Sequence, residues 1–158
     1  MDYNIEKFNN FITKWLNNKG FDVVAKMDTN FSSDITTNTI YYSIIVPQDF
    51  DDLFIKEVQK DFPEIVKCDT FLLSLFHELG HIETADYWTD KEWQKYYEFI
   101  TKPELLDDPL PYFRHPVEWE ATKWGCEYII NNSLEVGVFY NTIQELVQEV
   151  IDKNHIIL

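Results

Sequence analysis

The segment His77–His81 reads HELGH and matches the pattern H-E-x-x-H. Histidines four positions apart lie on one face of a helix, with Cβ atoms roughly 5–6 Å apart, so both rings can bind one metal ion. Glu78 lies beside the pair, where its carboxylate can reach a water molecule at the metal. The pattern predicts a Zn²⁺ site with Glu78 as the general base for attack of water on a carbonyl group. A buried helix that carries two histidines by chance is the competing interpretation.

A catalytic zinc ion takes three protein ligands and keeps one position open, so a third ligand must come from elsewhere in the chain. The helix expected over residues 117–129 is the best source. Glu118 and Glu120 are separated by about 200° around that helix, so only one of them can face the metal. Helical rotation alone leaves both open. The downstream candidates are His115, Glu118, Glu120, Glu127 and the distant His155.

HELGH followed by a helix with E-x-E-A, here Glu118–Ala121, resembles the ImmA/IrrE family of zinc metallopeptidases. Members of that family carry H-E-[LI]-G-H and a later E-x-E-A-[ND]-x-F-A. The resemblance implies Glu-zincin chemistry, with the glutamate directly before the alanine, Glu120, as the third zinc ligand beside His77 and His81.

The same resemblance implies an architecture of a helix, a small sheet, the motif helix and the glutamate helix. It places the segment Thr39–Val46 where the family has a strand that flanks the substrate. Thr122 and Trp124 depart from the family pattern, which calls the family's repressor-cleaving role into question for this chain.

A zinc peptidase also needs a hydrogen-bond donor for the developing oxyanion, and three candidates precede the glutamate helix. These are Tyr112, Arg114 and His115, of which His115 is the preferred one; a surface loop histidine is its competing interpretation. Gly80, between the two histidines, weakens the helix by about 1 kcal/mol relative to alanine. No structural benefit of Gly80 is evident from the sequence, which favours a functional site.

The surrounding elements predict a mostly helical α+β fold: a zincin-like single domain over residues 1–158 with a small antiparallel sheet packed on the motif helix. Apolar spacing indicates the helices, and β-branched or aromatic runs indicate the strands. The capping-box pattern Thr142–Glu145 predicts the start of the last helix. Helices are expected over residues 4–18, 50–61, 70–85, 90–100, 117–130 and from 142 onward, strands over 21–25 and 39–46, and an irregular Pro-rich connection over 102–116.

Composition limits the function classes. Among 158 residues, 13 are basic and 28 acidic, a net charge of −15, which disfavours nucleic acid and anionic membranes as direct partners. The sequence shows neither a secretory signal nor an apolar run long enough to span a membrane, so we expect a cytoplasmic protein. Cys68 and Cys126 form no CxxC motif and are expected to be reduced thiols.

These observations predict a zinc metalloendopeptidase whose substrate is a specific intracellular protein or peptide. Two alternatives come from other classes. One is a protein whose zinc site serves stability or partner binding. The other is an acidic interaction or inhibitor protein, of the kind that phages and mobile elements encode, with a structural or vestigial zinc site.

Overall fold

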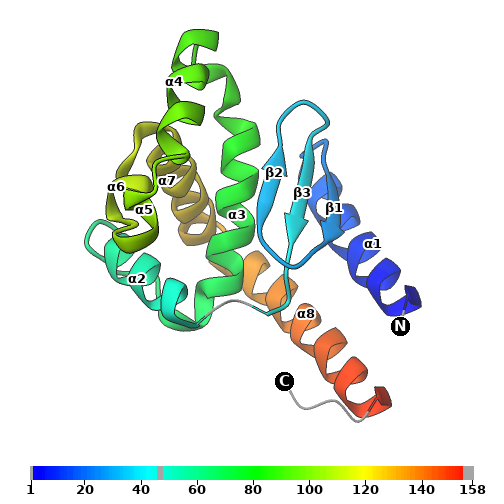
Figure 1. The fold of residues 1–158 in the computed structure, drawn as a ribbon. Helices are drawn as coiled ribbons and strands as arrows, with labels where there is room; N and C mark the ends of the chain where they lie inside the picture. Colours follow the sequence, from blue (N-terminus) through cyan, green and yellow to red (C-terminus); the bar gives the residue numbers. More distant parts are fainter. Residues whose placement is uncertain (1, 46–47, 155–158) are drawn as a thin grey trace.

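A computed structural model describes residues 2–45 and 48–154 (Figure 1). Within these ranges the chain is mostly helical and has one small sheet, as the sequence predicted. The order of elements is α1 (Asp2–Asn18), β1 (Val24–Met27), β2 (Ser32–Asp34), β3 (Thr39–Tyr42), α2 (Gln48–Gln59), the 3-10 turn η1 (Lys67–Asp69), α3 (Thr70–Glu83), the 3-10 turn η2 (Ala85–Tyr87), α4 (Asp90–Ile100), α5 (Glu104–Asp107), α6 (Leu110–Arg114), α7 (Pro116–Asn131) and α8 (Ser133–Asn154).

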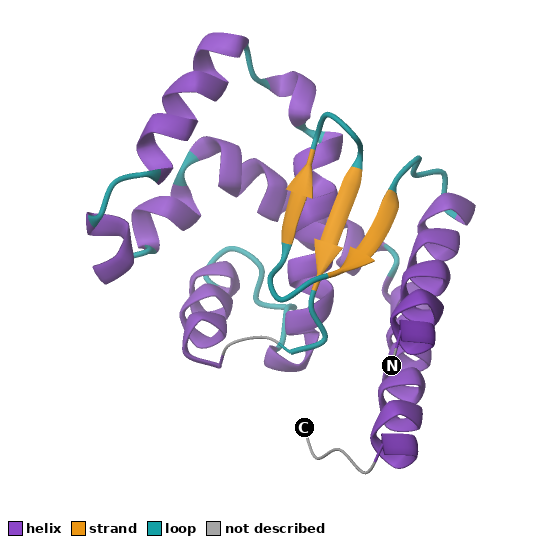
Figure 2. Ribbon diagram, turned by 45° about the vertical axis from the view of Figure 1, so that its right-hand side comes forward, coloured by secondary structure: helices purple, strands orange, loops and turns teal. Residues whose placement is uncertain are grey.

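Helix α3, which carries HELGH, lies at the centre of the molecule (Figure 1). The sheet and α1 lie on one side of it, whereas α2 and the α4–α7 segment lie on the other, and α8 runs beside α1 (Figure 2). Apolar residues cover α3 on several sides, because Leu73, Leu75, Phe76 and Leu79 are all fully buried. A helix that is apolar almost all round belongs in the core, and this burial makes α3 a rigid support for its polar residues.

The sheet packs on α3, as predicted, but it is mixed and not antiparallel as expected. Its order is β1-β3-β2, with β2 antiparallel and β1 parallel to the central strand β3. The β1 strand takes that place because α1 covers its outer edge: the Ala25 amide donates to Thr13 Oγ1 (2.8 Å) and the Met27 amide to Asn9 Oδ1 (2.7 Å). Such side-chain pairing depends on tertiary structure, so strand periodicity does not reveal it.

Both predicted strands differ in extent from the observed ones. The strand expected over residues 39–46 ends at Tyr42, because the Ser43 hydroxyl bonds both the amide and the carbonyl of Ile45 and turns the backbone. Val46 lies outside the described residues. The strand expected over residues 21–25 is shifted to Val24–Met27, because the Asn17 side chain holds the Phe21 and Val23 carbonyls in the turn that follows α1.

Helix α4 has the predicted bounds and starts at a capping box formed by Thr89 and Glu92. Helix α8, in contrast, begins at Ser133, so the predicted start at Thr142 is wrong. The Thr142 hydroxyl donates instead to the Val138 carbonyl (3.2 Å) one turn earlier, as such hydroxyls do inside helices. Within the described ranges, no helix combines the length and the hydrophobicity that crossing a bilayer requires.

The Pro-rich connection contains two short helices, α5 and α6, where the sequence predicted irregular structure. Pro103 and Pro109 stand at their N-caps and Pro111 near the start of α6. Proline at a helix start costs no hydrogen bond, because the first amides of a helix have no partner within it. The prolines therefore begin helices here instead of preventing them.

Candidate metal centre

The site depends on a close crossing of α3 and α7. A Cβ atom on Gly80 would lie 2.4 Å from the Ala121 carbonyl oxygen, and one on Gly125 would lie 2.9 Å from the Phe76 carbonyl group. Both distances are far below normal contact, so the helices approach each other through backbone at these two positions. Gly80 therefore has the structural benefit that the sequence did not reveal: it lets α7 reach the face of α3 that bears the histidines.

His77, Glu78 and His81 form a group that could hold a metal ion. One ligand atom from each of the three lies within 4.8 Å of the other two. The histidine ring centroids are 4.6 Å apart, and Glu78 and His81 are buried. The helical spacing thus brings together the three residues that the HELGH motif predicted.

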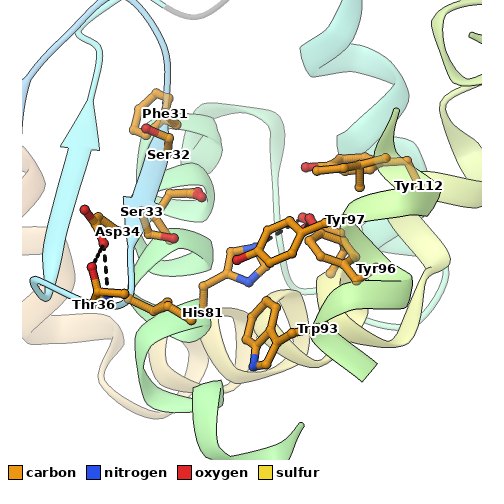
Figure 3. A pocket seen from close by; sticks show the side chains of 14 residues that line it. Phe31, Ser32, Ser33, Asp34, Thr36, His81, Trp93, Tyr96, Tyr97 and Tyr112 are labelled. Carbon is orange, nitrogen blue, oxygen red and sulfur yellow. Dashed lines mark hydrogen bonds and ion pairs between the residues drawn. The ribbon is translucent and has the colours of Figure 1, made fainter. Parts of the chain in front are cut away.

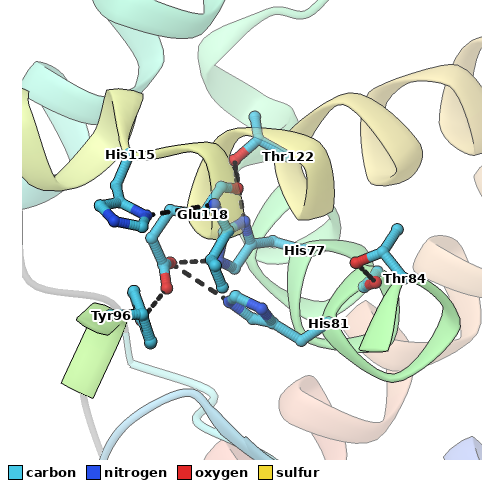
Figure 4. A network of polar contacts seen from close by, with 9 residues as sticks. His77, His81, Thr84, Tyr96, His115, Glu118 and Thr122 are labelled. Atoms are coloured by element: carbon cyan, nitrogen blue, oxygen red, sulfur yellow. Dashed lines mark hydrogen bonds and ion pairs between the residues drawn. The ribbon is translucent and has the colours of Figure 1, made fainter. Parts of the chain in front are cut away.

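The carboxylate that joins this group belongs to Glu118 and not to Glu120 (Figure 4). Oxygen Oε1 of Glu118 lies 3.0 Å from His77 Nε2 and 3.2 Å from His81 Nε2, and the residue is 2% exposed. Glu120 lies on another face of α7, half-exposed, with its carboxylate 3.6 Å from Lys123 Nζ. Only one of the two glutamates faces the histidines, as the rotation argument required, and it is not the one that the resemblance indicated as the third ligand.

These three side chains have the spacing of metal ligands. Ligand atoms around a tetrahedral zinc ion with bonds of about 2.0–2.2 Å lie about 3.3–3.6 Å apart. The observed separations of 3.0 and 3.2 Å between Glu118 Oε1 and the two ring nitrogens are close to that range. The donor set of two imidazoles and one carboxylate is also one that zinc uses in catalytic sites.

Thr122 restricts the tautomer of His77. Its hydroxyl donates to the Glu118 carbonyl (3.1 Å), so its lone pair must accept the bond from His77 Nδ1 (2.9 Å). With its hydrogen on Nδ1, a neutral His77 ring presents a lone pair at Nε2 to Glu118 Oε1. Two acceptors at 3.0 Å repel each other, so either a proton on the ring or a metal ion must lie between them.

The electrostatics of the site separate its two carboxylates. Burial would raise the pKa of Glu118, but hydrogen bonds from His77 and His81 outweigh it and hold this pKa well below its usual range. For Glu78 burial prevails over the attraction of the two histidines, and its pKa is raised. One carboxylate is thus kept as an anion between the rings, whereas the other has more affinity for a proton, as a general base requires.

The pKa of His81 is raised for a related reason. Burial opposes its charged form, but the hydrogen bond and the negative charge of Glu118 outweigh that effect. The pair of Glu118 and His81 therefore attracts positive charge in the form of a proton. A divalent cation would satisfy the same need and would compete with that proton for the ring nitrogen.

Two tyrosines complete the surroundings of Glu118. The Tyr96 hydroxyl of α4 donates a short hydrogen bond to Glu118 Oε2, and Tyr112 of α6 interacts with both residues. Burial, assisted by the charge of Glu118, raises the pKa of both tyrosines, so their hydroxyls stay protonated and able to donate. The hydrogen bond between Tyr96 and Glu118 had no signal in the sequence.

His115 occupies a different place from the one expected. It is the N-cap of α7, where its Nδ1 accepts a hydrogen bond from the Val117 amide (3.2 Å), and its ring packs against Tyr96 and Phe99. Burial lowers its pKa. Among the three oxyanion candidates, the described residues that line the cleft include Tyr112 but neither His115 nor Arg114. The structure therefore gives His115 a capping position beside the site.

A cleft of about 510 Å³ opens onto Glu78, His81 and Glu118 (Figure 3). One wall is the segment from Phe31 to Thr36, which includes β2, and the other is formed by α4 and Tyr112. The resemblance placed the substrate-flanking strand at residues 39–46. In the structure β3 is the central strand of the sheet, and the edge strand along the cleft is β2.

We compared the chain with models of protein families, with curated proteins and with solved structures, and found no significant match in any of the three.

Proposed function

We propose that the protein is a zinc-dependent peptidase in which His77, His81 and Glu118 bind the metal and Glu78 is the general base. The observation that carries this proposal is the convergence of Glu118 Oε1 on both histidine Nε2 atoms, with Glu78 next to them at the floor of an open cleft. A structural zinc site favours four closed ligands. Three ligands, a neighbouring carboxylate and access from a cleft are the components of a hydrolytic site.

Each group of the chain has a defined task in this proposal. Zinc, when bound, polarises the scissile carbonyl and lowers the pKa of water to about 7. Glu78, whose carboxylate lies beside the two histidines, would take the proton of the attacking water and pass it to the leaving amine. Tyr112, which lines the cleft with a protonated hydroxyl, donates to the developing oxyanion.

The substrate class follows from the cleft. Among the described residues β2 is an edge strand of the sheet and lies along the cleft, and an extended peptide can pair with such an edge through its backbone. The resemblance of HELGH and the later glutamate helix to ImmA/IrrE peptidases supports a specific intracellular protein as the substrate. Because Glu118 takes the ligand position here, the resemblance supports the class of chemistry and not its exact ligand assignment.

The test compares wild type, Glu78→Gln and the matched control Glu83→Gln, an exposed glutamate of the same helix. We expect all three to bind one equivalent of zinc, and only Glu78→Gln to lose cleavage of a host-cell lysate scored by new amino termini. A wild-type protein without zinc contradicts the metal site. Zinc retained by a wild type that cleaves neither lysate proteins nor a mixed peptide library contradicts the peptidase and favours the acidic interaction protein with a structural or vestigial site.

A further inference from the structure

We infer that Tyr96 is a positioning residue that fastens α4, one wall of the cleft, to the carboxylate of Glu118. The inference rests on the proposed function, since it assigns Glu118 as a metal ligand. It adds that metal binding and the docking of α4 stabilise each other through one hydroxyl group.

The first step concerns the two oxygens of Glu118. Oε1 lies between His77 and His81, whereas Oε2 accepts the hydrogen bond from Tyr96 (Figure 4). A carboxylate held in this way offers only one oxygen to a cation. The Tyr96 bond therefore keeps the second oxygen away from the open coordination position, where water and substrate must enter.

The second step concerns α4. Tyr96 is the single buried residue of this helix, whereas Tyr97 and Ile100 are exposed. The remaining attachments are modest: Phe99 packs against His115, and Trp93 Nε1 donates to the Ala85 carbonyl at 3.3 Å. The docked position of α4 thus depends strongly on the side chain that ends at Glu118.

These two steps give a reciprocal coupling. A cation between His77, His81 and Glu118 holds the carboxylate in the orientation that Tyr96 requires, so loading the site should tighten α4. A docked α4 in turn pre-positions Glu118 and should raise the affinity for the metal. Linkage requires both effects to have the same free energy. Substrate must then enter a cleft whose wall is set by the occupancy of the metal site.

The experiment measures both effects on the whole chain. Zinc affinity is determined by competition with a chromophoric chelator for wild type, Tyr96→Phe and the same-helix control Tyr97→Phe. Hydrogen exchange of residues 90–100 is followed with and without zinc, and α1 serves as the reference for global folding. We expect Tyr96→Phe to weaken zinc binding about tenfold, the range for outer-shell partners of a ligand, and to abolish the zinc-dependent protection of α4. Tyr97→Phe should change neither.

A second variant makes the result independent of how Tyr96→Phe folds. Glu118→Ala removes the acceptor, so α4 should exchange faster than in zinc-free wild type, with and without added zinc, while α1 stays protected. Unchanged zinc affinity with unchanged protection of α4 in Tyr96→Phe overturns the inference, as does an α4 that exchanges at one rate with and without zinc in wild type. If wild type binds no zinc, the proposed function itself fails, a result distinct from zinc binding without coupling.

Discussion

The crossing of α3 and α7 and the segment Asp90–Arg114 both line the candidate site, but they are fixed by different forces. At the crossing, backbone lies against backbone at Gly80 and Gly125, and the buried ring and carboxylate contacts of the site span the same two helices. The segment Asp90–Arg114, which contains α4 to α6, buries Tyr96 and Phe113 and is otherwise attached through polar side chains. Tyr96 bonds Glu118 at one end, and Arg114 pairs with Glu57 and Asp61 of the α2 region at the other.

The crossing of α3 and α7 thus sets the positions of the ligands, whereas the segment Asp90–Arg114 adjusts access to them. Close packing has a steep distance dependence, so the crossing limits how far the backbones that carry the ligands can shift. Hydrogen bonds and ion pairs respond to protonation, salt and ligands. The segment that forms the cleft wall and carries Tyr112 should therefore respond to such conditions more strongly than the backbone of the crossing.

The largest effect is expected from Gly80→Ala, which attacks the crossing directly. The new methyl group would lie 2.4 Å from the Ala121 carbonyl oxygen, so the helices must separate, at a cost of about 3 kcal/mol in the free energy of unfolding. Zinc affinity should fall together with stability, because Glu118 moves away with α7. Urea unfolding and chelator competition measure the two losses.

Gly137→Ala is the matched control for this substitution. Gly137 lies within α8, and a methyl group added there would meet no heavy atom within 4 Å, so alanine should stabilise the helix by about 0.5–1 kcal/mol. If Gly80→Ala behaved like Gly137→Ala, the close crossing would be refuted.

The next effect distinguishes the two glutamates of α7. Glu118→Gln removes the anionic oxygen between the histidines and should weaken zinc binding at least about 100-fold, since even outer-shell partners contribute 10–100-fold. Glu120→Gln changes a half-exposed side chain that pairs with Lys123 and should leave zinc affinity unchanged. Calorimetric titration of both variants with zinc measures the two affinities. A larger loss of affinity in Glu120→Gln than in Glu118→Gln would support Glu120 as the third ligand.

A smaller effect is expected from Thr122→Val, which keeps the shape of the side chain but removes the acceptor for His77 Nδ1. The ring then loses its fixed tautomer, and zinc affinity should fall about tenfold. Thr122→Ser restores the hydroxyl and should restore the affinity. Equal affinities of the valine and serine variants would show that Thr122 does not orient His77.

The smallest effect concerns the other end of the polar segment. Lys60 and Arg114 lower the pKa of Glu57 below its ordinary value of 4.5. A lowered pKa in the folded state means that the pair contributes stability above 4.5 and loses it as pH falls through the folded value. Glu57→Gln should therefore cost about 1 kcal/mol near neutral pH, and this cost should shrink progressively as the pH is lowered below 4.5, as measured by urea unfolding across that range. A cost that does not change with pH would contradict this ion pair.

Much of the site could be predicted from the sequence where local rules decide. The spacing of His77 and His81 and the burial of their helix follow from the 3.6-residue period, and the bounds of α4 follow from the capping box at Thr89. The burial of Glu78 and Glu118, in contrast, cannot be predicted from nearby residues in the sequence, because it depends on how α3, α7 and α4 pack together. The choice between Glu118 and Glu120 depends on the angle at which α7 crosses α3, which is set by two glycines far apart in the sequence.

The remaining errors have the same origin. The parallel pairing of β1 with β3 depends on Asn9 and Thr13 of α1, and the start of α8 overrides a capping pattern at Thr142 that is satisfied inside the helix. The role of Tyr96 depends on where α4 docks, about which its own sequence says nothing. Tertiary context, and not propensity, decides each of these cases.

The two glycines also fix the distance between helices α3 and α7. Since backbone lies against backbone at Gly80 and Gly125, rotation of a side chain at either position cannot change the distance between the two helices. A change in that distance requires movement of two whole helices against the core. The separation of the two backbones that carry His77, His81 and Glu118 is thus a property of the scaffold.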